Sequence, residues 1–93
     1  MRLSTHEINS IKETLKNLDQ DARIYLFGSR VDNKKRGGDI DLLIFSQKLK
    51  EEDRFRIKMN LWEQIGEQKI DIIIARDESD PFTRIALRRA VLL

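Results

Sequence analysis

The stretch that decides the fold runs from Phe27-Gly28-Ser29-Arg30 to Asp39-Ile40-Asp41-Leu42. An apolar run, 24–27, stops at Gly-Ser, and a second apolar run, 42–45, begins directly after two aspartates. Alternate side chains of a strand point to the same face. The pattern therefore predicts a strand over 39–45 with the carboxylates of Asp39 and Asp41 on one side. Neither carboxylate has a basic residue in its own strand, so a divalent cation is the natural partner.

The Gly28-Ser29 turn is suited to phosphate, because exposed backbone N–H groups and a small hydroxyl can approach an anion closely. We expect a turn of helix over 29–33 whose first N–H groups face a bound phosphate. Arg30 either helps to neutralise the phosphates or is an exposed arginine at a helix start, and we favour the first interpretation. A metal site beside a phosphate site indicates nucleotide chemistry.

Composition narrows the class of protein. A chain of 93 residues predicts a single domain over 1–93, with little room for a separate substrate-binding module. There is no cysteine and only one histidine, His6, which excludes disulfides, thiolate metal sites and multi-histidine sites. A net charge of +2 is too weak to indicate nucleic acid as the main ligand. No apolar run reaches the roughly eighteen residues of a membrane span, so we expect no membrane partner and a cytoplasmic location.

The periodicity of apolar residues predicts the remaining elements. Ser4 and Glu7 have the spacing of a capping box at the start of the first helix. Asp80-Pro81 has the composition of an N-cap followed by the first helical residue. The pattern predicts helices over 4–18, over 50–65 and from Pro81 to the end of the chain, and strands over 23–27, 39–45 and 70–75. This order predicts an α/β or α+β fold, in which helices pack on one small sheet of three or more strands.

Asp39, Asp41 and Asp71 are the only carboxylates in the predicted strands. A generic Asp-x-Asp pair often only caps a strand and pairs with a lysine, but the Gly-Ser turn, the apolar runs and the third aspartate favour a functional site. Two-metal phosphoryl transfer needs carboxylates that converge on divalent ions, and Mg²⁺ prefers oxygen ligands. Asp39 and Asp41 would bridge the metals. Asp71 would complete the site and accept the proton of the nucleophile if its strand lies beside theirs.

Phe27-Gly28-Ser29, nine further residues and then Asp39-Ile40-Asp41-Leu42 resemble the signature of the DNA polymerase beta-like nucleotidyltransferase superfamily. The Gly-Ser-Arg and Gly-Gly-Asp-Ile-Asp-Leu sequences are most similar to the minimal nucleotidyltransferases (MNT) of prokaryotes, and the resemblance covers roughly residues 8–76. It implies a mixed-sheet nucleotidyltransferase fold that uses Mg²⁺ and a nucleoside triphosphate. It also implies roles for five residues: contact with the triphosphate for Gly28 and Ser29, metal binding for Asp39 and Asp41, and the third carboxylate for Asp71.

The resemblance also implies a partner. MNT proteins are commonly paired with a HEPN-domain ribonuclease toxin, which they neutralise by binding it and by transferring AMP from ATP to one of its tyrosines. This chain would then be the antitoxin. Two alternatives stay open: a non-catalytic antitoxin that acts by stoichiometric binding, and a nucleotidyltransferase acting on a small molecule or an RNA end. In the last case a homo-oligomer could supply the missing wall of the site.

Three other segments have competing interpretations. The run Lys34-Lys35-Arg36 either attracts a triphosphate or RNA or is a solvated loop. The last predicted helix is apolar over more than one face, with arginines between the apolar residues. It either packs on the sheet or offers a surface for a partner or a second copy. Met59 and Trp62, on the long helix over 50–65, are predicted to lie in the core.

Overall fold

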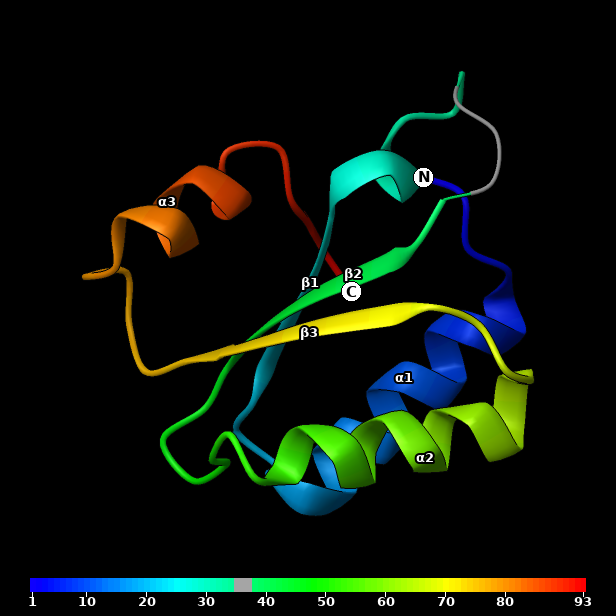
Figure 1. Cartoon of the computed structure of the whole chain (residues 1–93), viewed down its shortest axis with the longest axis horizontal. Coiled ribbons are helices and arrows are strands. Elements are labelled where there is room, and N and C mark those ends of the chain that lie inside the picture. Colours follow the sequence, from blue (N-terminus) through cyan, green and yellow to red (C-terminus); the bar gives the residue numbers. More distant parts are fainter. Residues whose placement is uncertain (35–37) are drawn as a thin grey trace.

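The computed structural model describes residues 1–34 and 38–93. Its centre is a four-stranded sheet in the order β3-β2-β1-β4 (Figure 1). β1 pairs antiparallel with β2 and with β4, whereas β2 and β3 run parallel. The strands are β1 (Arg23–Phe27), β2 (Ile40–Phe45), β3 (Ile70–Ala75) and β4 (Val91–Leu92). The predicted α+β class with a small mixed sheet is confirmed.

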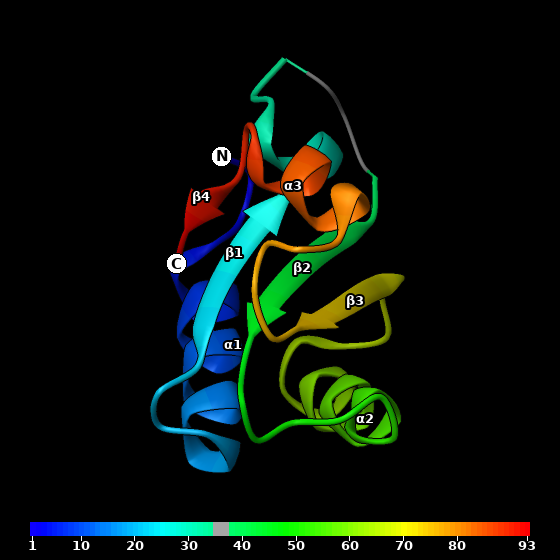
Figure 2. The ribbon, with the colours of Figure 1, turned by 90° about the vertical axis from the view of Figure 1, so that its left-hand side faces the viewer.

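Two helices, α1 (Thr5–Leu18) and α2 (Asp53–Ile65), cover one face of this sheet (Figure 2). α1 begins with the predicted capping box: Ser4 Oγ accepts the Glu7 N–H at 3.0 Å, and Glu7 Oε1 accepts the Ser4 N–H at 2.9 Å. α2 begins three residues later than predicted, because the Asp53 carboxylate accepts the Lys50 N–H at 2.8 Å and closes a turn there. None of the helices within residues 1–34 and 38–93 is long and apolar enough to cross a membrane.

The core lies between the sheet and these two helices. Alternate residues of β1, β2 and β3 face the helices and are fully or almost fully buried. The core side chains from strands and helices include Ile11, Leu15, Ile24, Leu26, Ile40, Leu42, Ile44, Ile57, Leu61, Ile70 and Ile72. Because side chains alternate along a strand, the residues between them, Asp41 and Asp71 among these, belong to the opposite face. The core thus determines on which face of the sheet the carboxylates lie.

The row of α2 that contains Met59 and Trp62 is less buried than predicted. Trp62 is half-buried at the edge of the core, and its indole N–H donates to the Gln68 carbonyl at 2.7 Å. The Met59 side chain is 39% exposed, so its predicted place in the core is wrong. The buried stripe of α2 is the narrower row through Ile57 and Leu61.

The predicted helix from Pro81 to the end of the chain is also wrong beyond Leu87. α3 (Pro81–Leu87) begins as expected, with Asp80 accepting the Phe82 N–H at 2.8 Å. The chain then turns, and Val91–Leu92 forms β4 on β1, while the Leu93 N–H donates to the Ile24 carbonyl at 2.9 Å. Without β4, β1 would present a row of unpaired backbone groups at the edge of the sheet. This long-range pairing outweighs the local helical pattern.

Core packing of α2 generates a test with two variants of the same helix. Leu61→Ala removes a fully buried side chain and is expected to lower the free energy of unfolding by about 2–5 kcal/mol. Met59→Ala removes a side chain that is 39% exposed and should cost less than about 1 kcal/mol. Urea unfolding followed by circular dichroism measures both. Equal losses in the two variants would contradict the orientation of α2.

Candidate metal centre

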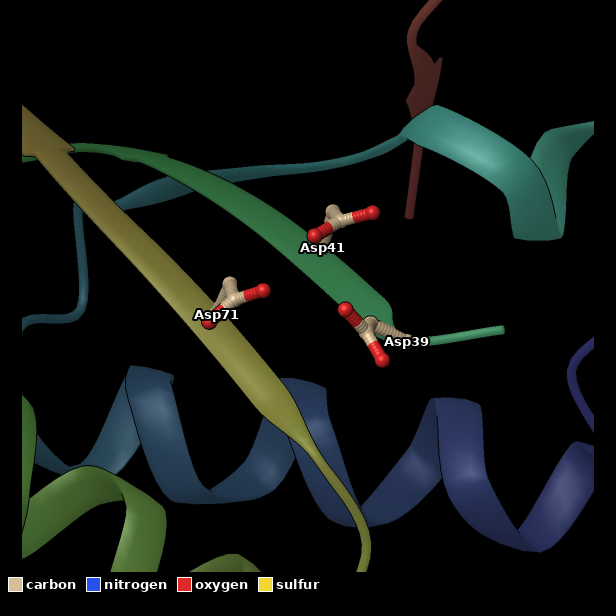
Figure 3. Close-up of side chains that lie close together, drawn as sticks. All are labelled: Asp39, Asp41 and Asp71. Carbon is tan, nitrogen blue, oxygen red and sulfur yellow. The ribbon is translucent and has the colours of Figure 1, made fainter.

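Three carboxylates gather on the face of the sheet opposite α1 and α2 (Figure 3). Asp39 lies one residue before β2, Asp41 lies in β2 and Asp71 in β3. Asp41 and Asp71 are direct neighbours in the parallel register, so their side chains project side by side. Each of the three residues offers a carboxylate oxygen, and these oxygens all lie within 4.8 Å of one another. The structure thus brings together the three aspartates that the sequence singled out, and their catalytic and metal-binding roles stay predictions.

Burial and the close approach of like charges make ionisation of the central aspartate unfavourable. Burial, followed by the neighbouring charges of Asp71 and Asp39, raises the pKa of Asp41 to about 6. Lys69 Nζ lies 3.3 Å from Asp39 Oδ2, and this partly exposed ion pair raises the pKa of Lys69. One lysine against three carboxylates leaves the cluster with excess negative charge.

Sequence reasoning missed Lys69. The residue lies just before β3, and the Ile40 N–H donates to its carbonyl at 3.0 Å, which places it beside Asp39. Lys69 comes to lie beside Asp39 through the parallel register of β2 and β3, because the pairing of Ile40 with Ile70 aligns the residues that precede them. Nothing in the local sequence indicates that register.

The donor set fits Mg²⁺. Carboxylate oxygens are the ligands that Mg²⁺ prefers, and the ion usually keeps several waters. Here Asp71 is exposed and Asp39 and Asp41 are only half-buried, which leaves room for such waters. A divalent ion would also remove the repulsion that raises the pKa of Asp41.

Gly28 has two reasons to be glycine. Its φ of +75° is a conformation that side chains with a Cβ rarely adopt, and a Cβ there would lie 2.2 Å from Asp41 Oδ2. The pairing of Phe27 with Asp41 brings this about, because it places the residue after β1 against the carboxylate. The Gly-Ser turn therefore touches the carboxylate cluster directly.

Ser29 joins the same turn to the start of β2. A Cβ on Gly38, where φ is +93°, would lie 2.2 Å from Ser29 Oγ, so the hydroxyl lies against the Gly38 backbone. The turn of helix predicted over 29–33 is a short 3₁₀ turn, η1 (Gly28–Val31). Of the predicted basic run Lys34-Lys35-Arg36, the last two residues lie outside the described residues, and its role stays untested.

Arg30 makes three contacts that tie segments together. Its guanidinium donates to the Gly38 carbonyl at 3.2 Å, to the Arg2 carbonyl at 3.0 Å and to Gln68 Oε1 at 3.3 Å. These bonds connect η1 to the N-terminal segment and to the turn before β3. These hydrogen bonds give Arg30 a structural role in fixing η1, and its contact with phosphate stays a prediction.

Arg2 is a second residue that sequence reasoning missed. Its guanidinium donates to the Ser29 carbonyl and to the Asp32 carbonyl, both at 2.9 Å. It thereby holds η1 from the side of the N-terminal segment. No local pattern signals this contact, since Arg2 and Ser29 are brought together only by the fold.

The geometry of Gly28 generates a test with a matched control. Gly28→Ala is expected to destabilise the protein and to weaken Mg²⁺ binding by about tenfold or more, because the new Cβ displaces the Asp41 carboxylate. Gly66 also has a positive φ, +87°, but nothing lies within 4 Å of a Cβ there. Gly66→Ala should therefore lose only about 1–3 kcal/mol of stability and keep its Mg²⁺ affinity. Calorimetric titration with Mg²⁺ measures the affinities, and equal affinities in both variants would contradict the contact.

The raised pKa of Asp41 generates a prediction about stability. A carboxyl group with a raised pKa stabilises the fold most when protonated, so its contribution is present below about pH 4 and is lost as the pH rises through about 6. At pH 7.5 without metal, Asp41→Asn should raise the free energy of unfolding by about 1–2 kcal/mol, a value reduced by solvent screening. The gain should shrink at pH 4. Chemical denaturation at both pH values checks this, and a variant less stable than wild type at pH 7.5 would refute it.

Comparison with known protein families identifies the family of this chain. The family model described as polymerase beta, nucleotidyltransferase matches residues 9–93. The match extends past the 8–76 segment of the sequence resemblance and takes in α3 and β4 as well as the carboxylate cluster. No curated protein matched the chain. With the match running over most of its length, the chain belongs to the polymerase beta nucleotidyltransferase family.

Proposed function

We propose that this protein is a Mg²⁺-dependent nucleotidyltransferase that transfers AMP from ATP to a tyrosine hydroxyl of a HEPN ribonuclease toxin, and so acts as its antitoxin. The observation that carries the proposal is the cluster of Asp39, Asp41 and Asp71 directly against the Gly28-Ser29 turn, in a chain of a nucleotidyltransferase family. An ATP donor also favours the cytoplasmic location that we expect from the sequence.

The three carboxylates have different roles in this proposal. Asp39 and Asp41 would hold the divalent ions, which would neutralise phosphate charge and activate the attacking oxygen. Asp71 is the exposed member of the cluster and lies on β3 at the edge of the sheet. It is therefore the carboxylate that an incoming hydroxyl reaches from solvent, and it accepts the proton.

The bonds made and broken follow from the chemistry of a triphosphate. The acceptor oxygen forms a bond to the α-phosphorus of ATP, and the bond from that phosphorus to the oxygen bridging to the β-phosphate breaks. Pyrophosphate leaves, AMP stays on the acceptor, and the hydroxyl proton passes to Asp71. Catalysis of this kind depends mainly on positioning and charge stabilisation, which a rigid sheet supplies.

The Gly-Ser turn positions the phosphates. Gly28 has no Cβ, so its backbone approaches Asp41 Oδ2 closely, and a phosphate bound to the turn would lie beside the carboxylate cluster. The Ser29 hydroxyl lies against Gly38 and would donate a hydrogen bond to a phosphate oxygen at this turn. The contacts of Arg2 and Arg30 hold this turn in place.

A protein acceptor is supported by the open side of the site. A hollow of about 310 Å³ lies beside Asp71, between α2 and the edge strand β3, and is lined by Arg54, Phe55, Lys58, Asp71 and Ile72. Phe55 is 70% exposed there, and it lies next to two cationic side chains. An acceptor that brings its own apolar and acidic surface would complete the wall of this hollow.

Labelling of the toxin tests the proposal. With Mg²⁺ and ATP labelled at the α-phosphate, label should appear on the tyrosine of the partner toxin. The variant Asp39→Asn with Asp41→Asn should lower the labelling rate by at least about 100-fold, because the ions lose two of their three protein ligands. Asp21→Asn with Glu52→Gln removes two exposed carboxylates outside the cluster, so it is the charge-matched control and should label at the wild-type rate.

Other outcomes identify the alternatives. Toxin neutralisation that survives the double substitution would refute catalysis and indicate a stoichiometric antitoxin. Label transferred to RNA ends or to a small molecule, and not to the toxin, would refute the protein acceptor while keeping nucleotidyl transfer.

A further inference from the structure

A second hollow adjoins the metal centre on the side opposite Asp71. It has a volume of about 420 Å³ and lies between the end of β1 and α3, which stand next to each other in Figure 2. This volume falls within the range of small-molecule sites. The residues that line it include Phe27, Gly28, Phe82, Ile85, Arg88 and Arg89.

Gly28 connects this hollow to the metal centre. The position where a Cβ would be placed on Gly28 faces Asp41 Oδ2, and the same residue lines the hollow. Phe27, also in the lining, is the direct cross-strand neighbour of Asp41. A ligand with phosphates at the carboxylate cluster can therefore reach the hollow across one glycine.

The charge in the lining fits an anion. Arg88 and Arg89 are exposed, and no carboxylate contributes to the described lining of the hollow. Within residues 1–34 and 38–93, neither guanidinium makes a hydrogen bond or ion pair. Arg30, in contrast, is already engaged with Gly38, Arg2 and Gln68. A triphosphate beside three carboxylates needs cations, and these two arginines are free to supply them.

The apolar part of the lining fits a flat ring. The Phe82 and Ile85 side chains are each 58% exposed, so they contribute little to the stability of the fold. An aromatic ring next to arginines is a common surface for a nucleobase, because base–aromatic stacking tolerates every base. An apolar hollow with two cations at its rim thus has the chemistry of a nucleoside phosphate.

We propose that this hollow binds the nucleoside of the triphosphate donor. Phe82 stacks on the base, and Arg88 and Arg89 bind the phosphates of the donor. The inference rests on the proposed nucleotidyl transfer but is independent of the acceptor. It makes the α3 segment a part of the donor site and not a docking surface for a protein partner.

Binding measurements without any toxin test this inference. Calorimetric titration with MgATP and with magnesium tripolyphosphate separates the base from the phosphates. Phe82→Ala should weaken MgATP binding by about five- to tenfold and leave tripolyphosphate binding unchanged. The double variant Arg88→Gln with Arg89→Gln should weaken both ligands by about tenfold or more.

Matched controls come from α2. Met59→Ala removes an apolar side chain that is 39% exposed, and Arg56→Gln removes an arginine that pairs with Asp53 at 2.7 Å outside the hollow. Both should bind the two ligands like wild type. Thermal unfolding of each variant verifies folding, which these exposed positions should preserve.

The outcomes separate this inference from the proposed function. If wild type fails to bind MgATP, or if the α3 variants bind both ligands like wild type, the donor pocket is refuted. If those variants instead lose toxin binding while MgATP affinity is unchanged, α3 is a protein interface and the inference is wrong. If the predicted losses appear but the toxin is never labelled, the donor pocket stands and only the acceptor is refuted.

Discussion

The parallel pairing of β2 with β3 is the constraint on which the rest of the structure depends. It places Asp41 beside Asp71 and Lys69 beside Asp39, and it puts Ile40, Ile70, Leu42 and Ile72 on the face that meets the helices. A shift of one residue would turn the core residues to the open face and the carboxylates into the core. The buried apolar face therefore holds the three carboxylates together, although burial and the neighbouring charges of Asp71 and Asp39 raise the pKa of Asp41.

The antiparallel pairing of β1 with β2 has a different consequence, because it places the backbone at the end of β1 beside the carboxylates. Phe27 pairs with Asp41, so the chain must turn away immediately after β1 to avoid the carboxylate. Glycine at position 28 permits that turn, and Gly38 permits the return of the chain past Ser29. At both positions the missing side chain lets the backbone pack closely, against Asp41 at Gly28 and against Ser29 at Gly38.

Local sequence predicted those features that depend on neighbouring residues. The capping box of α1 and the bounds of β1 and β3 follow from short-range periodicity. The same periodicity puts Asp39 and Asp41 on one face, but their convergence with Asp71 also depends on the pairing of β2 with β3. Features set by long-range pairing were not predictable in this way. The segment 88–93 has a helical pattern, yet β4 forms because β1 otherwise has an open edge. Lys69 lies beside Asp39 only because β2 and β3 pair in this register, and Arg2 contacts Ser29 only because the fold brings the N-terminal segment next to η1. Met59 is exposed because α2 buries a narrower stripe than its apolar residues suggest.

The two sides of the carboxylate cluster differ, and this difference bears on where a reaction partner would bind. In-line displacement at phosphorus requires the attacking and leaving oxygens to lie on opposite sides of the α-phosphate. The Gly28 side is bounded by η1 and α3, whereas the Asp71 side opens past the edge strand β3 onto Arg54, Phe55 and Lys58. If the triphosphate lies on the Gly28 side, as we propose, the acceptor would approach across β3. An edge strand has unpaired backbone groups that another chain can satisfy, and this supports the protein acceptor of the proposed function.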